Sequence, residues 1–146
     1  MSADSMRERL RFIDFEIRHL QNSRCRARAV LEFHPGERFI GTSEEIGSPA
    51  GELRCAAQAC LSAIEQASSA DASFELLGVK SVRAFDSTVV IVSLSSQEGT
   101  HVSRLVGSYI SDSASPRGAA LAVLNATNRS LGNIFSRAQR EADRTE

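Results

Sequence analysis

The same four-residue pattern opens two segments of this chain that have helical spacing, 67 positions apart. Ser48-Pro49-Ala50-Gly51 begins the first segment, and Ser115-Pro116-Arg117-Gly118 begins the second. Serine is a preferred N-cap residue, and proline is favoured at the first helical position. The pattern therefore predicts helices at residues 49–67 and 116–134. Because so specific a start occurs twice, the chain is expected to contain a duplicated supersecondary unit.

The segments before the second helix are extended in character. Residues 73–85, 87–96 and 101–110 are predicted strands, and the β-branched run from Val89 to Val92 is the clearest of them. In the first half, residues 26–34 and 37–43 predict a hairpin around Pro35-Gly36. Both halves are therefore expected to end in strand, strand, helix.

A third pair of small residues follows the same spacing. Gly41-Thr42 is expected to end the strand before the first helix, and Gly107-Ser108 is expected to do so before the second, 66 positions later. Each pair is then followed by a loop of small polar residues.

The stretch RLRFIDFEIRHL, residues 9–20, fits two structures when taken alone. Met6, Leu10, Ile13, Ile17 and Leu20 have helical spacing, whereas Ile13, Phe15 and Ile17 also alternate with charged residues as in a strand. An offset of 64 places Leu10, Phe12, Ile13 and Phe15 on Phe74, Leu76, Leu77 and Val79, in the first strand of the second unit. The repeat therefore favours a strand over residues 9–19, with a helix as the alternative.

These elements predict one α+β domain at residues 9–134, built from two βββα units, 9–68 and 73–134. Each unit is expected to form an antiparallel sheet covered by one helix, and the units are expected to pair about a pseudo-two-fold axis. Residues 1–8 form an N-terminal extension, and 135–146 form a charged tail.

With two βββα units in view, the chain resembles the C-terminal regulatory (dimerisation) domain of 2-isopropylmalate synthase and of its relative citramalate synthase. FELLGVKSVRAFDSTVVIVSL, residues 74–94, resembles the strand pair of that family, with Phe85-Asp86-Ser87-Thr88 at its Gly-Thr-Asp-Ala-type turn. RLVGSYISDSASPRGAALAVLNATNRSLG, residues 104–132, resembles the last strand, loop and closing helix. The segment GTSEEIGSP, residues 41–49, differs from the family's Gly-rich loop.

The resemblance implies a dimeric regulatory module that binds an amino acid between the two units and controls a catalytic barrel. A barrel of that kind needs about 200 residues or more, so this chain of 146 residues does not contain one. The resemblance therefore predicts a non-catalytic module that acts on a partner enzyme. A structural or assembly subunit that kept the dimerising fold is the alternative.

The helix starts are the candidate ligand site, because free N–H groups and partial positive charge there suit an anionic group. Asp14 and Asp86 are candidates to meet the amino group of an amino acid, and a 2-oxo acid is the other candidate ligand. The alternative is that the serines only cap helices and fill turns. The candidate ligand-binding residues are Gly41, Thr42, Ser48, Gly51, Asp86, Gly107, Ser108, Ser115 and Gly118.

Catalytic and metal-binding patterns are absent from the sequence. His19, His34 and His101 have no metal-ligand spacing, no nucleophile elbow or phosphate loop is found, and we expect no metal or cofactor. Cys25, Cys55 and Cys60 are expected to be buried, reduced thiols.

Charge and hydropathy narrow the range of partners. Arg24, Arg26 and Arg28 share one face of a strand and form a candidate surface for a protein partner or nucleic acid. A net charge of −1 and 5 % aromatic residues favour a solvated face over a nucleic-acid site. No apolar run is long enough to cross a membrane, and no signal peptide is evident, so a cytoplasmic location is expected.

Overall fold

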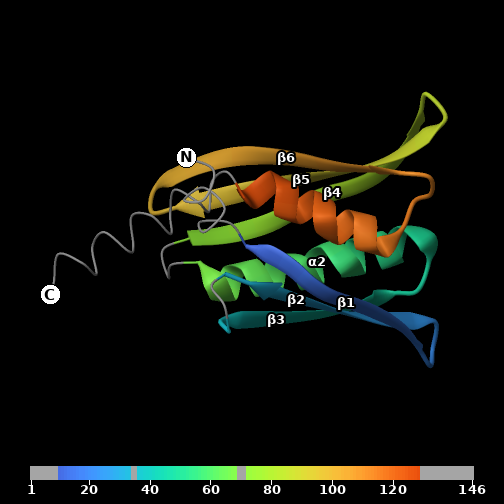
Figure 1. Ribbon diagram of the computed structural model, residues 1–146, viewed down its shortest axis with the longest axis horizontal. Coiled ribbons are helices and arrows are strands. Elements are labelled where there is room, and N and C mark those ends of the chain that lie inside the picture. Colours follow the sequence, from blue (N-terminus) through green and yellow to red (C-terminus); the bar gives the residue numbers. More distant parts are fainter. Residues whose placement is uncertain (1–9, 34–35, 69–71, 129–146) are drawn as a thin grey trace, which may run out of the picture.

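Two three-stranded antiparallel sheets enclose a layer of helices (Figure 1). The computed structural model describes residues 10–33, 36–68 and 72–128. The first sheet has the order β1 (Arg11–Leu20), β2 (Arg24–Glu32), β3 (Arg38–Ile46), and α2 (Pro49–Ala67) follows it. The second sheet has the order β4 (Ala72–Ala84), β5 (Ser87–Glu98), β6 (His101–Ser111), and a second helix follows at residues 116–128. The α+β class and the repeated βββα order are therefore confirmed.

The ambiguous stretch near the start of the chain is a strand. β1 pairs with β2 from Arg11 to Leu20, which rules out the helical alternative. A bulge interrupts this pairing between Phe12 and Asp14, and an equivalent bulge interrupts β4 and β5 between Leu76 and Gly78. The two bulged positions, Ile13 and Leu77, are 64 residues apart, which is the offset that aligned the two units in the sequence.

Both helices begin where the Ser-Pro pattern predicts. The Ser48 hydroxyl oxygen accepts a hydrogen bond of 3.0 Å from the amide of Gly51, and the Ser115 hydroxyl oxygen accepts one of 3.0 Å from the amide of Gly118. α2 spans the predicted range of 49–67. Residues 129–134 of the second predicted helix lie outside the described residues. So do the 1–8 extension, residue 9, the turn residues His34 and Pro35, and the 135–146 tail.

The helices form a middle layer because each contacts both sheets. α2 packs against β2 and β3 and also against β4. In the other helix, Gly118 of the first turn lies near Val90 and Tyr109 of the second sheet. The guanidinium of Arg117, the residue before it, lies 5.1 Å from the ring centre of Phe12 in the first sheet. The expectation that one helix covers one sheet was therefore incomplete, since α2 and Arg117 also tie the two units together.

The glycine of the third strand in each unit lies within that strand, and the prediction that Gly41-Thr42 and Gly107-Ser108 end their strands was wrong. β3 continues to Ile46 and β6 continues to Ser111. A Cβ atom at Gly41 would lie 2.0 Å from the carbonyl oxygen of Ala59, and one at Gly107 would lie 2.2 Å from that of Ala122. The glycines are needed because the helix backbone touches the strand backbone there.

We predict that Gly41→Ala destabilises the protein by about 1–3 kcal/mol or more, because the added methyl group meets backbone atoms that have no room to move. Gly78→Ala is the matched control, since its Cβ would meet nothing within 4 Å and its φ is not in the left-handed region. Chemical denaturation monitored by circular dichroism measures both. Equal loss of stability in the two variants would show that the contact with α2 is not the cause.

Candidate functional site

A surface cavity of about 410 Å³ lies where the two helices begin. Pro49, Ala50, Glu52 and Leu53 line it from α2, Val79, Lys80 and Ser81 from β4, and Ala114 and Pro116 from the start of the second helix. This volume is at the lower end of the range for small-molecule sites, and most of its lining residues are apolar. It therefore suits a metabolite with a short apolar body and few polar groups.

The cavity receives positive charge from two helix N-termini. Figure 1 shows α2 and the second helix running in the same direction, so both begin at the end of the molecule below the projecting β4–β5 hairpin. A helix N-terminus carries roughly half a positive charge and presents amide N–H groups. Two such ends beside one cavity favour an anionic group, such as a carboxylate, within it.

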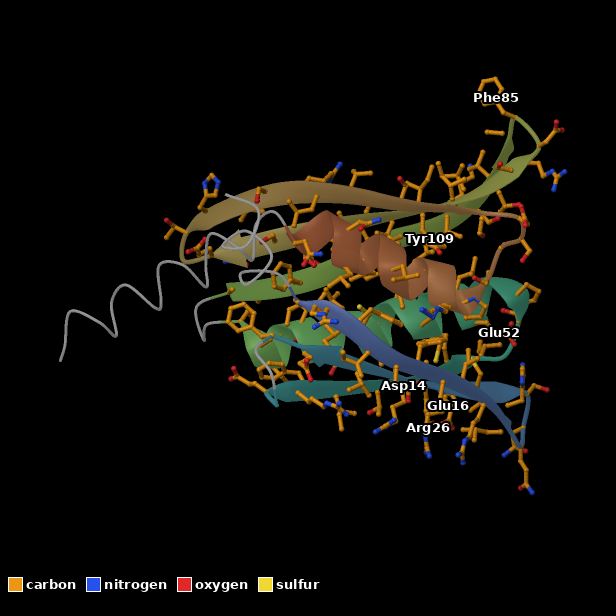
Figure 2. The ribbon with its side chains drawn as sticks, viewed as in Figure 1. Asp14, Glu16, Arg26, Glu52, Phe85 and Tyr109 are labelled. Atoms are coloured by element: carbon orange, nitrogen blue, oxygen red, sulfur yellow. The ribbon has the colours of Figure 1, made fainter. Side chains whose placement is uncertain are left out.

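Glu52 gives the cavity a negative group at the same end (Figure 2). Its side chain is only 24 % exposed, and its carboxylate contacts the Nε2 atom of His19, at the end of β1. The imidazole thereby holds the carboxylate in place. An ammonium group is the natural counterpart of a partly buried carboxylate at a cavity wall.

Lys80 stands at the edge of the cavity, on the edge strand β4. Its register opposite Ile91 places its side chain on the side of the sheet that faces away from the helices. Lys80 therefore contributes to the cavity wall from β4 while its side chain starts on the outer side of the sheet.

Four of the sequence-predicted ligand residues belong to the helix starts beside this cavity. Ser48 and Ser115 act as N-caps, and Gly51 and Gly118 supply the amides that they bind. A Cβ at Gly51 would lie 1.9 Å from the carbonyl oxygen of Ile46, so this glycine is also required for packing. The hydroxyl groups of Ser48 and Ser115 therefore cap helices, which is the alternative to ligand binding that the sequence left open.

The other predicted ligand residues lie away from the helix starts. Gly41 and Gly107 contact the helices in mid-strand. Thr42 lies with Arg26 and Glu44 in an open groove on β2 and β3. The Ser108 carbonyl accepts a hydrogen bond of 2.8 Å from the Asn125 side chain.

The two aspartates proposed to hold an amino group are not brought together. Asp14 pairs with Arg28 at 3.7 Å on the first sheet, on the side that faces away from the helices (Figure 2). Asp86 lies in the exposed two-residue turn between β4 and β5, where Phe85 and Asp86 both have positive φ. The chain instead offers Glu52 as the acidic group beside the cavity.

Glu52 and Lys80 were missed because neither belongs to a motif. Lys80 is the single lysine in a chain that otherwise uses arginine for its basic side chains. That was the one signal in the sequence that set it apart. Glu52 follows directly after the Ser-Pro-Ala-Gly pattern, and the contact with His19 from β1 arises only in the folded protein.

The Arg24, Arg26 and Arg28 side chains share one exposed face, and carboxylates accompany all three. The Arg26 Nε atom donates a hydrogen bond of 2.9 Å to Glu44, and the Arg24 Nε atom lies 3.8 Å from the same side chain. Arg28 pairs with Asp14 at 3.7 Å. The face is therefore close to neutral, which is typical of a solvated surface rather than of a phosphate-binding one.

The three cysteines are buried thiols, as the sequence predicts. The Cys55 thiol donates a hydrogen bond of 3.2 Å to the Ser43 carbonyl. Burial, with the neighbouring Cys25 as a second cause, raises the pKa of Cys55 to about 12. Burial alone raises the pKa of Cys60 to about 12. Both thiols therefore stay protonated, and unreactive, at neutral pH.

The described parts of the chain hold neither a metal-binding group nor a membrane span. Within residues 10–33, 36–68 and 72–128, no three His, Cys, Asp or Glu side chains are grouped to hold a metal ion. Over the same residues, no helix has the length and apolar character needed to cross a membrane.

Comparison with known proteins adds no family to this description: no family model matches the chain, and none of the curated proteins matches it. The properties of the site therefore follow from its own residues.

We predict that the free energy of unfolding falls as the pH rises from about 9 to 12. A thiol whose pKa is about 12 in the folded protein and 9.0 when unfolded stays protonated only in the folded state over this range. The unfolded state then binds fewer protons, so each of Cys55 and Cys60 lowers stability by about 1.4 kcal/mol per pH unit. Denaturant titrations at several pH values measure the slope.

Cys60→Ala is the control for this prediction, because it removes one of the two thiols and should make the slope shallower. The chain has only one lysine and one tyrosine, so few other groups titrate in this range. A slope that is the same with and without Cys60 would show that its burial does not control stability at high pH.

Proposed function

We propose that this chain is a non-catalytic, dimeric regulatory module that binds a small amino acid, or a related 2-oxo acid, and acts on a partner enzyme. The observation that carries the proposal is the cavity of about 410 Å³ between two helix N-termini, with Glu52 on its wall. A ligand carboxylate is stabilised by the helix ends. A ligand ammonium is stabilised by Glu52, and the apolar wall accepts a short side chain.

We further propose that the two βββα units are related by a pseudo-two-fold axis that runs along the helices and passes by the cavity. The equivalent bulges at Ile13 and Leu77, the identical caps and the two glycine–helix contacts support this relation. An axis in this direction puts both helix starts at one end. The resemblance to the regulatory domain of 2-isopropylmalate synthase agrees with this arrangement and suggests a partner enzyme.

A second candidate function, a structural or assembly subunit, is favoured by a different observation. Val102, Val106 and Ile110 of β6 are 59 %, 64 % and 65 % exposed, on the side of the second sheet that faces away from the helices. Exposed apolar side chains in a row indicate a surface that another protein covers. The two candidates differ in whether the cavity takes a ligand.

We predict that one or more amino acids raise the unfolding temperature of the protein by several degrees, since a ligand at a hundred times its Kd adds about 2.7 kcal/mol of stability. Differential scanning fluorimetry against a panel of amino acids and 2-oxo acids provides the screen, and titration calorimetry gives the affinity. Ala114→Phe fills the cavity without a change of charge and should abolish the shift. No shift with any compound of the panel would leave the assembly function as the better candidate.

The Glu52→Gln variant separates the two ligand classes. It removes the counterpart of the ammonium group, so the affinity for amino acids should fall about tenfold or more while that for 2-oxo acids is unchanged or higher. Glu37→Gln, an exposed carboxylate in the β2–β3 hairpin, is the matched control and should have no effect. Equal losses for both ligand classes would contradict the assignment of Glu52 to the ammonium group.

A further inference from the structure

The second sheet has an apolar surface on the side that faces away from the helices. β5 alternates strictly, with Val90, Val92 and Leu94 fully buried against the helices. The residues of β5 between them point to the opposite side of the sheet, away from the helices. The strand register shows which residues of β4 and β6 lie beside them on that side. The apolar outer face consists of Val82, Val89, Ile91, Val102, Val106 and Ile110.

The corresponding surface of the first sheet is charged. Asp14, Arg26, Arg28 and Glu44 occupy it and form the ion pairs described above, and Glu16 pairs with Arg18 beside them. Ile40 and Ile46 are exposed apolar side chains near the edge of this surface. The two units share one fold, so the difference is not required by packing inside the molecule. Water solvates the charged surface well, whereas Val82, Val89, Ile91 and Ile110 adjoin one another across three neighbouring strands and indicate a surface that is covered in use.

We infer that the apolar outer face binds the same face of a second copy of this chain, in a two-fold dimer whose axis runs along β5 between the two sheets. Such an axis places β4 of one copy over β6 of the other. Aligned face-to-face packing of two sheets is a standard arrangement in proteins. A row is a set of three residues, one from each strand, that are paired side by side across the sheet. Val82 and Ile110 belong to the row of Val89, so Val82 of one copy meets Ile110 of the other.

The charges on this face are self-complementary under that axis. Glu75 on β4 and Arg104 on β6 stand in one row, with Ser95 of β5 between them. Both side chains are exposed, and neither forms an ion pair with another described residue. The two-fold axis sets Glu75 opposite Arg104 of the second copy, and the symmetry makes this pair twice.

No like charges meet in the remaining rows. Lys80, in the row of Ile91, comes to lie over Ser108. Ser73, in the row of Gln97, comes to lie over Val102. Apolar side chains meet in the row of Val89 and at Ile91, while Val106 comes to lie over Gly78. A second copy of the chain therefore fits this surface in charge throughout and in hydropathy around Val89 and Ile91, which is the reason to choose it over an unrelated protein.

The size of the face is sufficient for a specific dimer. β6 has 11 residues. Three strands about 4.8 Å apart and rising about 3.3 Å per residue present roughly 14 Å by 36 Å, or about 500 Å² on each copy. The pair therefore buries about 1,000 Å² or more, which reaches the lower limit for a specific interface. We expect a dimer with a dissociation constant in the micromolar range.

The first test uses the full chain, without ligand, in sedimentation and light-scattering measurements from about 1 to 200 µM. Ile110→Glu should weaken dimerisation at least tenfold, because it buries a charge in the interface. Ile46→Glu is the matched control: Ile46 lies on the outward side of β3, in the first sheet, and is 59 % exposed against 65 % for Ile110. Circular dichroism confirms that each variant folds. A wild-type protein that stays monomeric, or equal effects of the two variants, would overturn the inference.

The second test exchanges charges and identifies the two-fold geometry. Glu75→Arg alone places two basic side chains opposite each other and should weaken the dimer about tenfold. Arg104→Glu alone should act likewise, and the Glu75→Arg/Arg104→Glu double variant should recover the affinity. A double variant as weak as the single ones would exclude this axis. Because ligand is absent throughout, failure here is separate from failure of the ligand-binding proposal.

Discussion

The contact between the backbone of each helix and a glycine in the third strand of its unit fixes the rest of this structure. At Gly41 and Gly107 there is no space for even one carbon atom between the strand and the helix. Such a close approach requires small helix residues, and Ala59, Ala63, Ala122 and Ala126 provide them. A side-chain amide completes each contact: Gln66 donates to the Ile40 carbonyl at 2.7 Å, and Asn125 to that of Ser108. The helices are thereby held at a set depth, which brings both of their starts to the wall of one cavity.

Much of the architecture was predictable because the two units share local signals. The Ser-Pro starts place both helices, and the offset between the units decides that residues 11–20 are extended, which their own periodicity leaves open. The limits of the strands were harder. Glycine is uncommon inside strands, so Gly41 and Gly107 resembled strand ends, and only the position of the helix explains why they lie in mid-strand.

The candidate site was only partly predictable, because its charged groups meet through packing of distant segments. The helix starts were found from their caps, whereas Glu52, His19 and Lys80 come from α2, β1 and β4. The alternation of β6 shows two faces but does not say which one meets the helices. Only the exposure of Val106 and Ile110 in the folded protein shows that their side of β6 is an outer surface.

The two outer surfaces of the molecule, one charged and one apolar, show what joining two similar units in a single chain makes possible. Each unit must keep the inner side of its sheet suited to the helices, but its outer side takes no part in that packing. In an assembly of two identical half-length chains, any change to one outer surface would appear on the other as well. When both units belong to one chain, this restriction is removed. The outer surface of one unit can then stay solvated while the outer surface of the other evolves to bind a partner.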